Sequence, residues 1–91
     1  MIVKQTGIFK RQIKKMHQQE KEALDEAVQQ IISDPSIGEM KVGDLAGIQV
    51  FKYKHKVQLY LLAYAYLEKE LVLALIEHGT HENFYRDLNR F

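Results

Sequence analysis

The stretch "VQLYLLAYAYL" (57–67) most limits what this chain can fold into, because it is almost continuously apolar. A run of this kind is typical of a β-strand that is buried on both faces of a sheet. Three charged residues, "EKE" (68–70), interrupt it, and the apolar "LVLALIEH" (71–78) follows. The pattern therefore predicts two buried antiparallel strands that are joined by a charged hairpin turn.

A third strand is predicted just before them, because "IQVFKYKH" (48–55) alternates and is rich in β-branched and aromatic residues. Alternate residues of a strand point to opposite faces, so Phe51 and Tyr53 share one face and the lysines share the other. We expect the aromatic face to meet the helices. The alternating lysines, Lys52, Lys54 and Lys56, have two interpretations. They either protect a sheet edge from pairing or bind the phosphates of a nucleic acid.

The first half of the chain predicts a short strand at "IVKQ" and then two helices over 7–16 and 18–33. Thr6 is a candidate cap for the first helix, and Pro35 ends the second. After Gly79, residues 81–90 predict a short final helix.

The element order β-α-α-β-β-β-α suits an α+β domain spanning residues 1–91. We expect an N-terminal helical hairpin packed on one face of a small antiparallel sheet, with a short C-terminal helix. The other face of the sheet should remain partly open.

Composition excludes several classes of protein. The chain has no cysteine, so disulfides and thiolate metal sites are absent. No apolar run approaches about 18 residues and no signal peptide is evident, so we expect a cytoplasmic protein without membrane contact. His78 and His81 are spaced like metal ligands, but Gly79 breaks the element between them and no fourth ligand is evident. We therefore expect neither a metal nor a cofactor.

The order of elements and three short motifs resemble the RelE/ParE superfamily of bacterial toxins from toxin–antitoxin pairs. The motifs are "GDLAG" (43–47), "YLLAY" (60–64) and "HGTHENFY" (78–85), and the last is similar to the ending of YafQ- and HigB-type members. The resemblance implies a toxin that is neutralised by a cognate antitoxin. Many members cut mRNA at the ribosome without a metal, whereas the ParE branch poisons DNA gyrase.

For RNA cleavage, the resemblance places an acid/base histidine at His81 and an aromatic residue at Tyr85. Histidine suits the role because its ordinary pKa lies near neutral pH. Lys52 and Lys54 are the candidate cations for the reacting phosphate. The candidate RNA-binding residues are Lys56, His55 and Arg86.

One position departs from the family pattern. The ribonuclease members often carry an arginine after the first tyrosine of the "YLLAY" stretch, and Leu61 stands there in this chain. Without that arginine, the phosphate-stabilising role would pass to lysines or to Arg86. It also favours two alternatives, a gyrase-binding toxin that catalyses no reaction and a non-toxic interaction module of the same fold.

Overall fold

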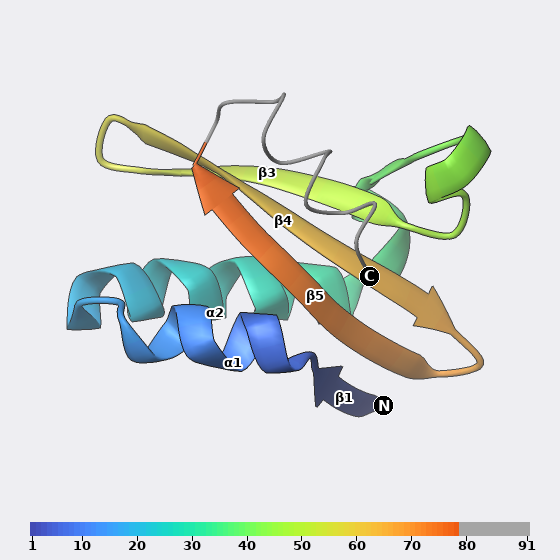
Figure 1. The fold of residues 1–91 in the computed structure, drawn as a ribbon, viewed down its shortest axis with the longest axis horizontal. Helices are drawn as coiled ribbons and strands as arrows, with labels where there is room; N and C mark the ends of the chain where they lie inside the picture. The colour runs from blue at the N-terminus through green and yellow to red at the C-terminus, as the bar shows by residue number, and fades with distance from the viewer. Residues whose placement is uncertain (79–91) are drawn as a thin grey trace.

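A helical hairpin lies against one face of a five-stranded sheet in the computed structural model, which describes residues 1–78 (Figure 1). The expected α+β architecture is confirmed. The short helix predicted over 81–90 lies outside the described residues.

The hairpin consists of α1 (Gly7–Lys14) and α2 (Gln18–Ser33), close to the predicted ranges. Thr6 caps α1 as expected, because its hydroxyl oxygen accepts a hydrogen bond from the Phe9 N–H at 3.1 Å. Such a cap satisfies one of the N–H groups that a helix start leaves unpaired. At the other end of α2, the chain turns into a short 3₁₀ helix, η1 (Pro35–Ile37), since proline cannot extend the α-helix. Neither helix is long and apolar enough to cross a bilayer.

The sheet has the strand order β1-β5-β4-β3-β2. Its strands are β1 (Ile2–Gln5), β2 (Glu39–Met40), β3 (Gln49–His55), β4 (Gln58–Leu67) and β5 (Glu70–His78). Strands β2 to β5 pair antiparallel, as expected, but β1 pairs parallel with β5, so the sheet is mixed. A tight turn forces its two strands to be antiparallel, whereas the long helical connection after β1 leaves the direction of its pairing free. The strand β2 was not predicted, because two residues are too short for a periodic pattern.

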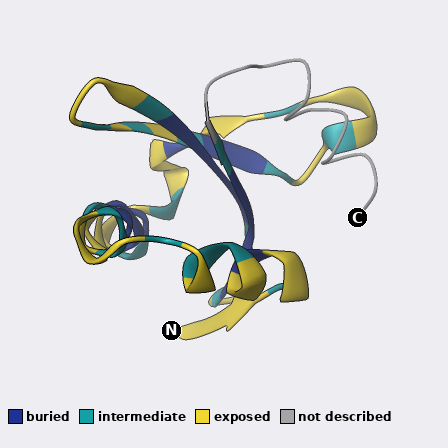
Figure 2. Cartoon of the chain, turned by 60° about the vertical axis from the view of Figure 1, so that its left-hand side comes forward, coloured by how far each residue is buried: buried dark blue, intermediate teal, exposed yellow. Residues whose placement is uncertain are grey.

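The two faces of the sheet carry separate apolar clusters. The helix-side face holds the larger one, in which Leu62 and Tyr64 of β4 are fully buried and Phe51 and Tyr53 pack against their neighbours. This arrangement confirms that the aromatic face of β3 meets the helices. The opposite face was expected to be partly open, yet it holds a second buried cluster. Its members are Val50, Leu61, Ala63, Ala74 and Leu75, with Leu45 and Ile48 packed against them. Figure 2 shows the buried middle of the sheet and the exposed ends of its hairpins.

The edge of β5 beyond β1 is closed by a side chain rather than by a strand. Gln12 of α1 donates from Nε2 to the carbonyl oxygen of Ile76 at 2.6 Å, and its Oε1 accepts from the Ile76 N–H at 2.9 Å. The Thr6 hydroxyl also donates to the Ala74 carbonyl. The amide of Gln12 therefore replaces the two hydrogen bonds that a neighbouring strand would make.

The Gln12→Ala variant should lower the free energy of unfolding by about 1–3 kcal/mol, because both backbone groups of Ile76 lose their partner. Urea denaturation followed by circular dichroism measures this change. The matched control is Arg11→Ala, which alters an exposed side chain on the same helix and should cost much less. Equal losses in both variants would contradict the role assigned to Gln12.

The turn between β4 and β5 is strained. Its two residues, Glu68 and Lys69, have φ angles of 53° and 67°, the left-handed region that favours glycine or asparagine. Leu67 and Glu70 are directly paired on either side of it. The predicted charged hairpin turn is thus confirmed, but these residues adopt a backbone conformation that is costly for them.

The Lys69→Gly variant should be more stable than the parent by about 0.5–1 kcal/mol, since relief of strain outweighs the added entropy of the unfolded chain. Thermal unfolding should show a higher midpoint. Val57→Gly is the control, because Val57 is 99% exposed in the other hairpin turn and its φ is not positive. A midpoint that falls in both variants would argue against strain at Lys69.

Candidate functional site

The structure brings Lys52 and Lys54 together on the sheet face that points away from the helices. Both side chains are exposed on β3, opposite Leu61 and Leu59 of β4. Alternate residues of a strand lie roughly 6.5–7 Å apart on one face. The two lysines therefore lie next to each other on this face, and we call them the lysine pair.

The other predicted residues do not all join the lysine pair. Lys56 is exposed in the turn after β3, where its φ is 57°. His55 ends β3 and has the same parity as Phe51 and Tyr53, so it lies on the helix-side face, opposite the lysine pair. The remaining candidates, His81, Tyr85 and Arg86, lie outside the described residues.

Leu61, which stands where the resemblance would place an arginine, shares the face of the lysine pair. It is directly opposite Lys52 on one side and Glu77 on the other, and it is 0% exposed. It belongs to the second apolar cluster together with Val50 and Leu75. The lysine pair therefore borders a buried apolar centre, and within residues 1–78 no arginine is carried by the sheet.

Around His55, a shallow groove of about 330 Å³ opens between the start of α2 and the β3–β4 hairpin. Its lining includes Glu20, His55, Lys56 and Tyr60. The Tyr60 hydroxyl donates to Glu20 Oε2 at 3.2 Å, and Glu20 Oε1 accepts from the backbone N–H of His17 at 3.4 Å. Glu20 therefore ties the start of α2 to the sheet. The sequence analysis missed this contact, although a glutamate three residues after a helix cap is a known signal for the local half of it.

The tyrosines beside this groove form part of the core. The ring of Tyr60 stacks on Tyr53 with 5.3 Å between centroids, and Tyr53 stacks on Phe51 at 6.4 Å. Burial, followed by the charge of Glu20, raises the pKa of Tyr60 above its ordinary value. Burial also raises the pKa of Tyr53, with further contributions from Tyr60 and Glu20. Both phenols therefore stay protonated at neutral pH and serve as hydrogen-bond donors rather than as bases.

Tyr64 has a structural role. Its hydroxyl donates to the Pro35 carbonyl at 2.7 Å and accepts from the Gly38 N–H at 2.9 Å. A Cβ at Gly38 would lie 2.6 Å from that hydroxyl oxygen, so only glycine fits beside it. Burial raises the pKa of Tyr64, and the bond from Gly38 partly opposes that shift. Tyr64 therefore holds the segment after α2 against the sheet.

Metal chemistry was not expected for this chain. Within residues 1–78, no group of three or more histidine, aspartate or glutamate side chains is arranged to hold a metal ion. The exposed ammonium groups of Lys52 and Lys54 are available to an anionic ligand on this face, which also carries Glu77 on the far side of Leu61.

Replacing Glu20 by glutamine should lower the pKa of Tyr60 towards its ordinary value, because the negative charge that opposes a tyrosinate is removed. Alkaline titration of tyrosine absorbance measures the change, with Glu22→Gln on the exposed side of α2 as the control. Since folding raises these tyrosine pKa values, the parent should lose stability as the pH rises above 10.0. The loss of stability with rising pH should be shallower in Glu20→Gln than in the parent. Identical tyrosine titration curves for Glu20→Gln and Glu22→Gln would contradict the assignment.

Comparison with known proteins shows which family the chain belongs to. A family model described as the ParE-like toxin of type II bacterial toxin–antitoxin systems matches residues 3–89 of the 91. A comparison with curated proteins finds no matching sequence. The matched region includes α1 and α2, strands β2 to β5, all of β1 except Ile2, and the lysine pair. The chain therefore belongs to the ParE-like toxins of type II toxin–antitoxin systems, a class in which the toxin is paired with an antitoxin protein.

Proposed function

We propose that this toxin inhibits translation as a ribosome-dependent, metal-independent mRNA endoribonuclease. The observation that carries the proposal is the lysine pair, because Lys52 and Lys54 are exposed side by side on one sheet face. Two ammonium groups so placed suit the phosphates of a single RNA strand. They also suit the negative charge that builds up on a phosphate under attack.

The proposed chemistry uses the RNA itself as the nucleophile. The ribose 2′-oxygen attacks the adjacent phosphorus, the bond to the 5′-oxygen breaks, and a cyclic phosphate and a 5′-hydroxyl result. His81 would take one of the two proton-transfer roles, receiving the 2′-hydroxyl proton or supplying a proton to the leaving oxygen. Tyr85 would stack on a displaced base or donate a hydrogen bond. Both residues follow the end of β5 closely in the sequence.

Three further residues have proposed binding roles. Lys56 occupies the tip of the β3–β4 hairpin and His55 the groove on its helix side. RNA that contacts all of them would have to pass around the hairpin tip, because His55 and the lysine pair lie on opposite faces. Arg86 is proposed as an additional phosphate contact, in place of the arginine that Leu61 replaces.

A second function, binding and poisoning of DNA gyrase, is favoured by one observation. Leu61 is 0% exposed, so the position that carries a phosphate-binding arginine in many ribonuclease members offers only a buried apolar group here. A toxin that acts by binding alone needs no acid/base residue. In that case the lysine pair would contact a protein or DNA surface, and His81 would be dispensable.

The Lys52→Ala/Lys54→Ala variant should lose mRNA cleavage on translating ribosomes by on the order of 100-fold, because the charge on the reacting phosphate loses its counterions. Primer extension across a translated mRNA measures cleavage, and growth after expression without an antitoxin measures toxicity. His81→Ala should likewise relieve growth arrest.

Two controls make this test specific. Lys52→Arg/Lys54→Arg keeps both charges and should retain most activity, whereas Lys10→Ala/Lys14→Ala removes the same charge from exposed positions of α1 and should have little effect. Full-strength arrest in His81→Ala, with translation continuing and DNA supercoiling impaired, would reject the ribonuclease and support the gyrase alternative.

A further inference from the structure

The strand β1 forms one end of the sheet, and no strand within residues 1–78 pairs with its outer edge. The N–H groups of Ile2 and Thr6 donate to carbonyl groups of β5 and of the turn before it, at 3.1 and 3.0 Å. Every second residue of a strand points its backbone groups to the same side. Val3 and Gln5 therefore direct their N–H and C=O groups outward, away from β5.

The side chains of this edge are mostly apolar, and its one charged side chain is neutralised. Met1, Ile2 and Val3 are exposed although they are apolar. The ammonium group of Lys4 lies 2.7 Å from a carboxylate oxygen of Glu70. An exposed apolar edge strand without an unpaired charged side chain is a template on which another chain can pair.

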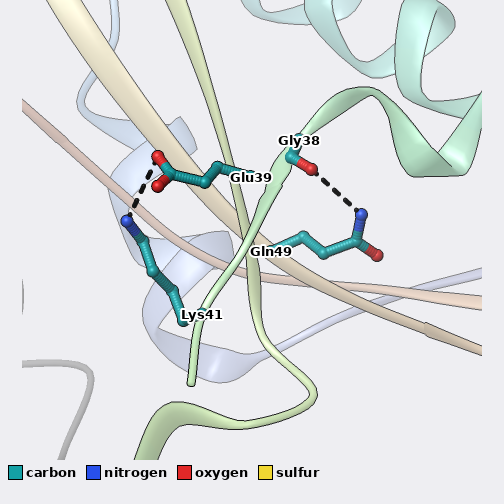
Figure 3. Close-up of polar contacts among 4 residues, drawn as sticks. All are labelled: Gly38, Glu39, Lys41 and Gln49. Atoms are coloured by element: carbon teal, nitrogen blue, oxygen red, sulfur yellow. Dashed lines mark hydrogen bonds and ion pairs between the residues drawn. The ribbon is translucent and has the colours of Figure 1, made fainter.

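The opposite end of the sheet is protected against such pairing. The strand β2 has only two residues and carries charge, since the Lys41 ammonium lies 3.4 Å from the Glu39 carboxylate (Figure 3). Gln49 Nε2 donates to the Gly38 carbonyl at 3.2 Å and holds the start of β2 against β3. Beyond β2, the edge of β3 carries the lysine pair, and lysines on an edge strand hinder self-pairing. Within the described part of the chain, β1 is therefore the edge that two copies can share.

The β1 edge is self-complementary in one register. Two copies related by a two-fold axis perpendicular to the sheet pair antiparallel, and directly opposed residues lie on the same face. A centre at Val3 places Val3 opposite Val3, Ile2 opposite Lys4, and Met1 opposite Gln5. The outward N–H and C=O groups of Val3 then bond to the same groups of the other copy. A centre at Lys4 would instead bring two ammonium groups directly opposite each other, which destabilises a strand pair.

The helix side of this edge has room for side chains of the second copy. A groove of about 200 Å³ is lined by Val3, Gln5 and apolar residues of α1, α2 and β5. Met1 of the other copy lies opposite Gln5 on this face, so its side chain is placed at the mouth of the groove. Each α1 begins at Gly7, past the position where the two chains face each other, so the two α1 helices leave the strand pair at opposite ends.

We propose that two copies of this toxin pair through the outer edges of their β1 strands, in the antiparallel register centred on Val3. The two five-stranded sheets then form one continuous sheet across the two-fold axis. Because the paired strands are short, we expect a weak dimer with a dissociation constant of roughly 10–100 μM. The inference goes beyond the proposed function and does not depend on it, because the lysine pair lies on β3, outside this interface.

Single cysteines report the register, because the chain has no cysteine of its own. In the proposed pairing, the Cα atoms of residue 3 in the two copies lie about 5.5 Å apart, a separation that a disulfide spans. Those of residue 5 lie about 13 Å or more apart, which a disulfide does not span. Under mild oxidation of the full-length toxin, Val3→Cys should form covalent dimers about tenfold or more faster than Gln5→Cys.

The control for random collisions is Gln29→Cys, on an exposed position of α2. It should crosslink as slowly as Gln5→Cys. The proposal is overturned if Val3→Cys crosslinks no faster than Gln29→Cys, or if Gln5→Cys crosslinks as fast as Val3→Cys.

A proline variant tests the backbone hydrogen bonds. Val3→Pro removes an N–H that points outward, so it takes away two bonds between the copies and none within either copy, and edge strands tolerate proline there. The dissociation constant, measured by sedimentation equilibrium, should rise about tenfold or more. Val3→Ala keeps the N–H and should weaken the dimer less.

Unchanged dimerisation in Val3→Pro would contradict the proposal, as would a parent protein that stays monomeric up to about 1 mM. Thermal unfolding of the dilute protein checks that each variant is folded. The cysteine variants keep the test independent of how well Val3→Pro folds.

Discussion

The burial of β4 on both of its faces is the constraint on which the rest of the structure depends. Four consecutive residues, Leu61, Leu62, Ala63 and Tyr64, are each 0% exposed. A strand of this kind needs a neighbour on each side and a layer on each face. Strands β3 and β5 supply the neighbours, and the helical hairpin supplies one layer. The second apolar cluster lies on the opposite face, because alternate residues of β4 point to that side of the sheet.

Sequence patterns could predict what repeats along the chain, and they failed where a contact joins distant residues. The alternation in β3 correctly placed Lys52 and Lys54 on the face away from the helices. No periodic pattern predicts the hydrogen bonds between Gln12 and Ile76, which lie 64 residues apart in the sequence. The same holds for the hydrogen bond between Tyr60 and Glu20, which lie 40 residues apart. Sequence patterns also could not predict that β1 pairs parallel with β5, because this direction depends on a contact between distant parts of the chain.

The β3–β4 hairpin presents two chemically different sides to a partner. One side carries the lysine pair beside an apolar centre, and the other carries His55 and the Glu20–Tyr60 contact beside stacked rings. Leu61 is fully buried and joins the lysine side to the second apolar cluster, so the lysines are carried by a strand that packs on this cluster rather than by a loop. A site on a strand of this kind is held in place without help from its ligand.

The parallel pairing of β1 with β5 also determines when the sheet is completed during synthesis. The first strand finds its partner only after residues 70–73 exist, and the helical hairpin is anchored to β5 through residues 74 and 76. Contacts of such long range form late and slow the folding of a chain. A nascent toxin therefore holds its N-terminal strand and its helices without their final support until residues 70–76 have been made.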